Sequence, residues 1–153
     1  MSKLKNMYKI GIDLGGTKIE GILLDEEHNA IKRYRIPTLQ EKGYDNVLER
    51  ITNVYNTLSG IINNKPHTLG IGTPGMNSAE GLMKNSSLIC LNGKALLKDL
   101  QDMLHREIGM QNDANCFAMA EAIMGSGKGS RMVFGVIMGT GCGGGIVYDR
   151  QLL

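Results

Sequence analysis

The sequence predicts an α/β fold, and three features of the chain carry this prediction. Apolar, β-prone runs open the chain and return near its end. Between them, apolar residues recur at helical spacing. Two glycine-rich stretches each follow directly on an apolar run: Asp13-Leu14-Gly15-Gly16-Thr17-Lys18 and Gly139-Thr140-Gly141-Cys142-Gly143-Gly144-Gly145. Each glycine stretch is therefore expected to be a turn between two strands, formed by the apolar runs before and after it.

The expected elements run along the chain as three strands, a helix, and then strands alternating with helices. They are strands over Tyr8–Asp13, Ile19–Leu24 and Ala30–Ile36, a helix over Tyr44–Ile62, a strand over Leu69–Gly72, a helix over Ala95–Arg106, a strand over Met110–Asn112 and a helix over Ala114–Met124. A linker over Gly125–Ser130 then leads to a last hairpin, Met132–Met138 with Ile146–Tyr148.

Three hairpin-linked strands followed by strand–helix alternation are typical of a ribonuclease H-like half-domain, the building block of actin-like ATPases. We therefore expect an N-terminal ribonuclease H-like domain over residues 1–125. Residues 126–153 are expected to be the linker and first β-hairpin of a second, truncated domain.

Composition narrows the class of protein. The chain has 153 residues, 42% of them hydrophobic, and a net charge of +2, so no nucleic-acid footprint is evident. No signal peptide is expected, because residues 1–5 lack an apolar stretch, and no apolar run approaches the roughly 18 residues that span a bilayer. Cys90, Cys116 and Cys142 are odd in number and lack a C-x-x-C pair, which is typical of reduced cytosolic cysteines. We expect a cytoplasmic protein with no nucleic-acid or membrane partner.

Two glycine motifs resemble nucleotide-binding signatures but lack their context. Gly139, Gly141 and Gly144 fit G-x-G-x-x-G, yet β-prone residues follow where a dinucleotide fold needs a helix. The stretch 125–130 resembles a P-loop, but Gly129 replaces the required Ser or Thr. A flexible linker is the better interpretation there.

Asp113 is the sharpest catalytic candidate, because it stands between a predicted strand and a predicted helix. A carboxylate at the end of a strand in an open α/β sheet can accept the proton of an attacking hydroxyl. Asp before a helix is also a common N-cap, and local sequence leaves both roles open.

The glycine turns and two later loops supply binding candidates. Backbone N–H groups of glycine turns can crowd around an anion, and glycine adopts positive φ without a Cβ clash. Asp13 could hold Mg²⁺ through water or bond the turn backbone, and Thr17 and Lys18 could meet phosphate oxygens or face solvent. The dense polar run Asn85-Ser86-Ser87 could recognise hydroxyl groups or form an ordinary surface loop.

Together these motifs resemble the ROK family of sugar kinases and sugar-responsive repressors. Ile12–Lys18 resembles its first phosphate motif, and Gly139–Gly145 its second. Gly70–Gly75 resembles the sugar-side loop, Asn85–Ser87 with Leu91–Lys94 a sugar-contact segment, and Asn112–Ala118 the catalytic stretch.

The resemblance implies ATP-dependent phosphorylation of a hexose or N-acetylhexosamine, usually at the 6-hydroxyl. It implies Asp113 as general base and Mg²⁺ with the nucleotide, held through Asp13. It further implies nucleotide contacts from Asp13, Gly15, Gly16, Thr17, Lys18, Gly139, Thr140, Gly141, Gly143 and Gly144, and sugar contacts from Gly75, Met76, Asn85, Ser87, Asn112 and Asp113.

The chain departs from the family in length, since members run to about twice this size. The family's zinc-binding loop and further sugar contacts lie beyond Leu153, so no zinc site is expected here and weak or no turnover is expected from these residues alone. Two alternatives are a regulator without its helix-turn-helix domain, for which only seven residues precede Tyr8, and a non-catalytic sugar-binding half-domain. A homodimer stays open.

Overall fold

The computed structural model describes residues 7–138 and 142–153 of the chain. These residues form two compact units, Met1–Met110 and Gln111–Leu153. Each unit has a hydrophobic cluster of its own. The two units are therefore described one after the other.

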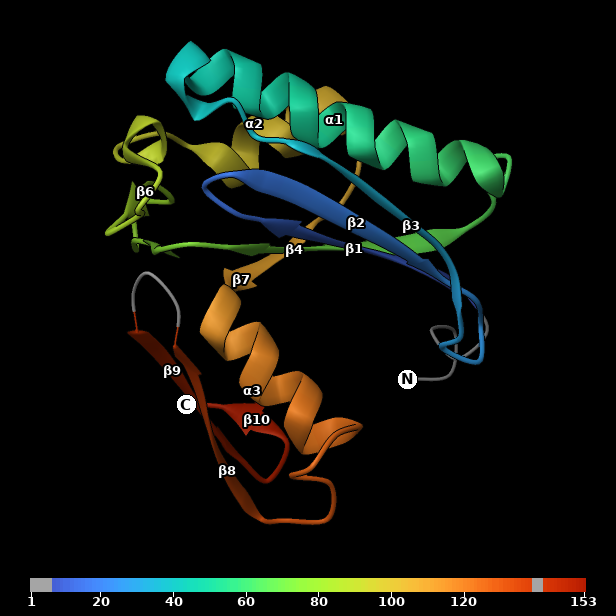
Figure 1. The fold of residues 1–153 in the computed structure, drawn as a ribbon, viewed down its shortest axis with the longest axis vertical. Helices are drawn as coiled ribbons and strands as arrows, with labels where there is room; N and C mark the ends of the chain where they lie inside the picture. The colour runs from blue at the N-terminus through green and yellow to red at the C-terminus, as the bar shows by residue number, and fades with distance from the viewer. Residues whose placement is uncertain (1–6, 139–141) are drawn as a thin grey trace. The chain divides into compact units, whose positions relative to one another are not determined.

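A five-stranded mixed sheet forms the framework of the first unit (Figure 1). Its strand order is β3-β2-β1-β4-β7, with bounds β3 Ala30–Pro37, β2 Lys18–Leu24, β1 Tyr8–Leu14, β4 His67–Thr73 and β7 Gly109–Asn112. β1 pairs with β2 in antiparallel fashion and with β4 in parallel fashion, so that Asp13 lies opposite both Glu20 and Gly72. The carboxyl ends of β1 and β4 therefore meet at one edge of the sheet.

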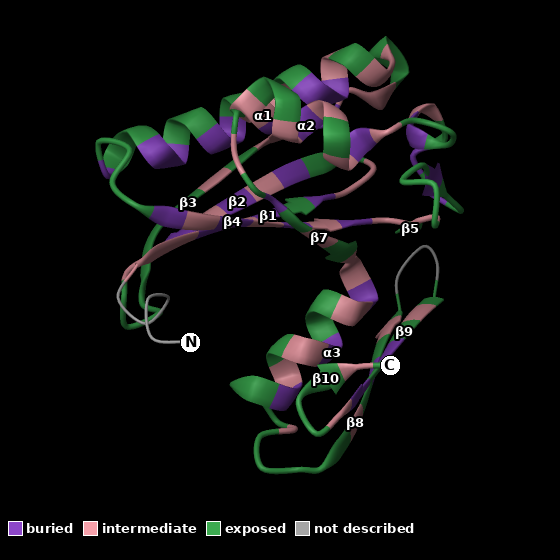
Figure 2. Cartoon of the chain, turned by 180° about the vertical axis from the view of Figure 1, so that it is seen from behind, coloured by how far each residue is buried: buried purple, intermediate pink, exposed green. Residues whose placement is uncertain are grey.

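Helices α1 (Tyr44–Ile61) and α2 (Leu96–Leu104) cover the same face of this sheet (Figure 1). Buried and exposed residues alternate along α1, as expected of an amphipathic helix packed on a sheet (Figure 2). The alternate residues Ile10, Ile12 and Leu14 of β1 are buried in the core beneath the helices. Because side chains alternate along a strand, Asp13 lies on the opposite face.

Short elements connect β4 to α2, and the sequence did not predict their strands. β5 (Met76–Asn77) pairs with β6 (Met83–Lys84) in a small hairpin. The 3-10 helix η2 (Ile89–Leu91) follows, and another, η1 (Gln40–Lys42), lies between β3 and α1. Two-residue strands are too short to show an alternating pattern, so periodicity could not reveal them.

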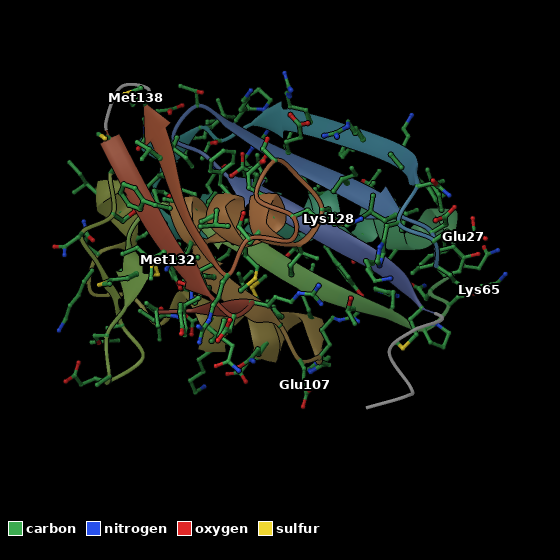
Figure 3. The ribbon with its side chains drawn as sticks, turned by 90° about the horizontal axis from the view of Figure 1, so that it is seen from below. Glu27, Lys65, Glu107, Lys128, Met132 and Met138 are labelled. Carbon is green, nitrogen blue, oxygen red and sulfur yellow. The ribbon has the colours of Figure 1, made fainter. Side chains whose placement is uncertain are left out.

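The second unit packs helix α3 (Asp113–Ile123) against a three-stranded sheet of order β10-β9-β8. The strands are β8 (Met132–Met138), β9 (Cys142–Tyr148) and β10 (Gln151–Leu152), and Figure 3 labels Met132 and Met138 at the two ends of β8. A Cβ on Gly135 would lie 2.8 Å from the Cβ of Ala118, so only glycine allows this close approach of helix and strand.

Helix α3 packs on β8 and β9 and so groups with them, while the domain boundary near residue 125 stays a prediction. The second strand of the expected last hairpin, β9, begins at Cys142 rather than at Ile146, so Gly143, Gly144 and Gly145 pair with β8 instead of forming the turn. The predicted linker after α3 is a run of hydrogen-bonded turns, in which Gly127 N donates to Glu121 O and Ser130 N to Gly127 O.

Among residues 7–138 and 142–153, no helix combines the length and the apolarity needed to cross a bilayer.

Candidate functional site

The first glycine turn joins β1 to β2 at the carboxyl end of β1. Gly15 N donates to Lys18 O at 2.9 Å, and a Cβ on Gly15 would lie only 3.0 Å from that same oxygen. Neither Gly15 nor Gly16 adopts a positive φ. The need for a small residue at Gly15 therefore comes from the close approach of the backbone to itself rather than from a positive φ.

Three consecutive carbonyl groups of this turn are bound by the segment that follows β3. Thr38 donates its hydroxyl to Gly15 O at 2.6 Å and its backbone N–H to Thr17 O at 3.0 Å. Gln40 Nε2 donates to Gly16 O at 3.0 Å. In a trans peptide the N–H of the next residue points opposite to the carbonyl, and the described residues contain no cis peptide. The N–H groups of Gly16 and Thr17 therefore point away from Thr38 and Gln40.

The polar side chains around the turn lie at the surface. Asp13, Thr17 and Lys18 are all exposed. The neighbour of Asp13 across the sheet, Glu20, accepts hydrogen bonds from Arg35 at 2.6 Å and Arg33 at 3.2 Å. The bond from Arg35 lowers the pKa of Glu20, so this carboxylate stays ionised and paired with the arginines.

The donor set at this edge fits a magnesium ion that arrives with a nucleotide. No group of three or more His, Cys, Asp or Glu side chains that could hold a metal occurs within the described part of the chain. Mg²⁺, however, commonly uses one carboxylate together with waters and phosphate oxygens rather than an all-protein cage. Asp13, an exposed carboxylate just before the glycine turn, suits that mode.

The loop after β4 contacts the segment after β6 backbone to backbone. Gly75 has a φ of +85°, and a Cβ there would lie 2.5 Å from Lys84 O and 2.8 Å from Ser86 N. Only glycine satisfies both the left-handed backbone and this contact. The structure thus brings the expected sugar-side loop, with exposed Met76, against the expected sugar-contact segment.

Within the segment Asn85-Ser86-Ser87, the middle residue is structural and the outer two are exposed. Ser86 N donates to Asn92 Oδ1 at 2.9 Å, and Asn92 Nδ2 donates to Ser86 O at 3.0 Å. Ser86 Oγ accepts from Leu88 N at 3.2 Å. This network fixes the backbone, including the left-handed φ of 54° at Asn85, and leaves the side chains of Asn85 and Ser87 at the surface.

The first glycine turn and the expected sugar-contact segment are neighbours in the same unit. A Cβ on Gly16 would lie 4.0 Å from Leu88 Cδ1, and the Leu88 side chain is fully buried. Leu88 follows Ser87 directly, so its packing places the polar segment beside the turn. The first glycine turn, the loop at Gly75 and the segment Asn85–Ser87 therefore converge at one edge of the sheet.

Asn112 and Asp113 begin helix α3, and the structure separates their roles. Asn112 is the N-cap residue, and its Oδ1 accepts from Ala114 N at 3.0 Å. Asp113 is the first residue of the helix; its Oδ1 also accepts from Ala114 N, at 2.8 Å. Both side chains therefore accept from the same N–H group at the start of the helix, and Asn112 holds the cap position that the sequence left open for Asp113. Both residues belong to the second unit.

The second glycine stretch also belongs to that unit, and two of its candidates have packing neighbours. A Cβ on Gly143 would lie 3.1 Å from Ala114 Cβ, and one on Gly144 would lie 3.0 Å from the ring of Phe134. The candidates Gly139, Thr140 and Gly141 lie outside the described residues.

Sequence reasoning missed Thr38 and Gln40, which hold the turn. Both are polar residues just after a strand, and nothing in the local pattern distinguishes them from an ordinary loop. Only the pairing of β3 with β2 brings them to Gly15, Gly16 and Thr17.

Proteins of known family and name match most of this chain. The family model described as "ROK family" matches residues 9–153. An N-acetylgalactosamine kinase from Shewanella sp. (strain ANA-3) is 34% identical over 142 residues, which cover 93% of this chain and 46% of that protein. An N-acetyl-D-glucosamine kinase from Photobacterium profundum is 38% identical over 149 residues, which cover 93% of this chain and 46% of that protein.

Solved structures confirm the predicted α/β, actin-like fold. A ROK family glucokinase from Streptomyces griseus in complex with glucose and AMPPNP superposes with a TM-score of 0.83 at 26% identity, covering 95% of this chain and 46% of that one. A polyphosphate/ATP-glucomannokinase from Arthrobacter sp. strain KM gives a TM-score of 0.82 at 29% identity, covering 97% and 61%. The chain spans about half the length of the curated relatives it matches. The family match and these relatives show that this chain belongs to the ROK family.

Proposed function

We propose that the protein transfers the γ-phosphoryl group of ATP to a hydroxyl of a hexose or N-acetylhexosamine, at the 6-position. One observation carries the proposal: a turn with outward N–H groups, the loop at Gly75 and the polar segment Asn85–Ser87 meet at one sheet edge. Such an edge can hold a phosphate chain beside a sugar. The relatives' names place them among sugar kinases, which supports the same reaction.

On the nucleotide side, the N–H groups of Gly16 and Thr17 would bind phosphate oxygens, with Lys18 adding positive charge. Gly15 would keep the turn narrow. Mg²⁺ at Asp13 would help to neutralise the charge that develops on the transferring group. The second set of phosphate contacts would come from the second glycine stretch, at Gly139, Thr140, Gly141, Gly143 and Gly144.

Asp113 would act as the general base. Phosphoryl transfer requires a group that accepts the proton of the attacking hydroxyl as the new P–O bond forms. Asp113 is a carboxylate at the start of α3, directly after strand β7 in the chain, which suits this role.

The sugar hydroxyls would be bound by Asn85, Ser87 and Asn112. The sugar site would also be lined by Gly75 and Met76. We favour N-acetylhexosamines over plain hexoses, because the relatives at 34–38% identity act on N-acetylated sugars by their names, while the glucokinase is 26% identical. The same relatives are kinases, so a regulatory role is not favoured.

We also propose a cytoplasmic location without nucleic-acid or membrane partners. A homodimer is the oligomer to test first, by light scattering. Turnover by these 153 residues alone is expected to be slow, because they span about half the length of their relatives.

Sugar-dependent ADP release by the purified chain tests the proposal. N-acetylglucosamine is expected to give the largest signal in a panel with N-acetylgalactosamine, N-acetylmannosamine, glucose, mannose and fructose. Asp113→Asn should lower the rate by a factor of about 10² to 10⁴, the usual contribution of a general base. Asp102→Asn, on the exposed surface of α2, is the matched control and should have no effect.

Sugar binding is measured alongside turnover by calorimetry, because slow release alone is ambiguous. Binding of a sugar that Asn85→Ala weakens, with release lost in Asp113→Asn, supports the assignment. Release that survives Asp113→Asn would contradict the catalytic role, and neither binding nor release with any sugar would contradict the proposed function.

A further inference from the structure

We infer that residues 37–40 form a brace that fixes the orientation of the first glycine turn, Gly15-Gly16-Thr17, with Thr38 and Gln40 as positioning residues for nucleotide binding. The inference rests on the proposed function, because it assumes that the turn binds phosphate. It adds residues outside every glycine motif and a physical route by which they act.

The brace binds the turn at three successive peptide groups. Thr38 uses its hydroxyl and its backbone N–H, and Gln40 uses its side-chain amide, so that the carbonyls of Gly15, Gly16 and Thr17 are all engaged. Thr38 is completely buried, so its hydroxyl bond is shielded from water. Adjacent glycines have unusual backbone freedom, and these bonds restrict it.

The brace is in turn attached to helix α1. Asn46 Nδ2 donates to Thr38 O at 3.1 Å and to Leu39 O at 2.9 Å. Arg50 Nε donates to Pro37 O. Because Asn46 and Arg50 lie in the first two turns of α1, the helix holds the carbonyl side of the brace while Thr38 and Gln40 hold the turn.

The backbone conformation at Leu39 indicates that surrounding hydrogen bonds determine the shape of the brace. Leu39 has a φ of 52° and a ψ of 49°, the left-handed region that residues other than glycine seldom occupy. Such a conformation persists only where surrounding bonds determine it, and these residues tend to gather at functional sites. Asn46 donates to the carbonyl of Leu39 and to the carbonyl of Thr38 before it, so the peptide groups on both sides of the Leu39 Cα are held by hydrogen bonds.

Fixing the carbonyls also fixes the N–H groups. With its carbonyls held by the brace, the turn keeps the Gly16 and Thr17 N–H groups pointing the other way before any ligand arrives. Donors that are already oriented lose little freedom on binding, which increases affinity. Removal of the Thr38 hydroxyl should therefore weaken phosphate binding while sugar binding stays as it is.

The test compares Thr38→Val, which keeps the volume and removes the hydroxyl, with Thr38→Ser, which keeps the hydroxyl. The probe is inorganic tripolyphosphate, titrated with and without Mg²⁺ and followed by ¹⁵N NMR at the Gly16 and Thr17 amides. In the parent chain both amide signals should shift. Thr38→Val should weaken binding about three- to tenfold, as expected for the loss of one hydrogen bond, and Thr38→Ser should stay within about twofold.

Two further variants complete the design. Gln40→Met removes the second donor at similar size and should also weaken binding; it decides the question if Thr38→Val does not fold. Thr57→Val is the control, because the Thr57 hydroxyl donates to Asn53 O within α1, at 2.8 Å. Affinity for N-acetylglucosamine should not change in any of them.

The outcomes separate this inference from the proposed function. Tripolyphosphate binding of equal strength in the parent chain, Thr38→Val and Gln40→Met would overturn the brace and leave the kinase proposal standing. No shift of the Gly16 and Thr17 amides in the parent chain would overturn the phosphate role of the turn, and with it both proposals.

Discussion

At the scale of single residues, Gly75 shows how the lack of a Cβ lets two loops pack together. Its backbone is left-handed, and the place where a Cβ would be is occupied by the backbone of Lys84 and Ser86. Gly75→Ala should therefore lower the free energy of unfolding by about 2 to 4 kcal/mol, through the strain of the left-handed backbone and overpacking together. Urea denaturation measures the loss.

Gly81→Ala is the matched control for this prediction. Gly81 has a φ of +80°, but nothing lies within 4 Å of the site where its Cβ would be. It should show only the backbone part, about 1 to 2 kcal/mol. Equal losses in both variants would mean that the contact between the loops contributes nothing.

At the scale of elements, a buried polar cluster connects α1, the start of β4 and the chain just after α2. Arg106 donates to Tyr55 Oη, to His67 Nε2 and, at 2.6 Å, to His67 O. Because arginine has only donors, Nε2 must be the acceptor, and the proton of the ring lies on Nδ1, 2.6 Å from Lys65 O. His67 is therefore neutral in the folded protein.

This cluster predicts a pH-dependent stability. Burial, assisted by the charge of Arg106, lowers the pKa of His67 from its ordinary value of 6.5. Below about pH 6.5 the unfolded chain takes up a proton that the folded chain does not, so the free energy of unfolding should fall as the pH drops from 6.5 toward the lowered pKa. Above pH 6.5 this contribution is constant.

Thermal unfolding between pH 5 and pH 8 checks the prediction. His67→Gln should flatten the dependence in the range just below pH 6.5, whereas His28→Asn, which removes an exposed histidine, should retain it. An unchanged slope in His67→Gln would assign the pH dependence to other groups.

At the scale of the whole molecule, the two units have very different cores. The first unit buries large side chains such as Ile51, Leu58 and Leu100 in one cluster. The buried members of the second unit's cluster are Ala118, Ala122 and Val147, and large apolar side chains of β8 stay exposed, with Phe134 at 65% and Met138 at 84%. Little apolar area is therefore removed from water in the second unit.

Hydrogen exchange should reveal this difference directly. Amides of β8 and β9 are expected to exchange faster than those of β1 and β4, because local opening costs less free energy where few apolar contacts are lost. Mass spectrometry of peptides from each unit gives the comparison. Equal protection in both units would show that they open together.

Local sequence patterns predict much of the fold. Val47, Leu48 and Ile51 recur at helical spacing, and α1 forms where they predict it. Apolar runs before each glycine stretch predict β1 and β8, and both form. The order of strands and helices then indicates the ribonuclease H-like arrangement, because few topologies accommodate that order.

The sequence by itself thus determined the long helices and strands, the fold class, the family and the candidate segments, since periodicity and turn chemistry act over a few neighbouring residues. Only the tertiary structure decided that Asn112 caps α3, that Gly75 touches Ser86, and that Thr38 and Gln40 hold the glycine turn. The last two contacts join residues that are 11 to 24 positions apart. Such contacts exist only after strands have paired, and no local pattern records them.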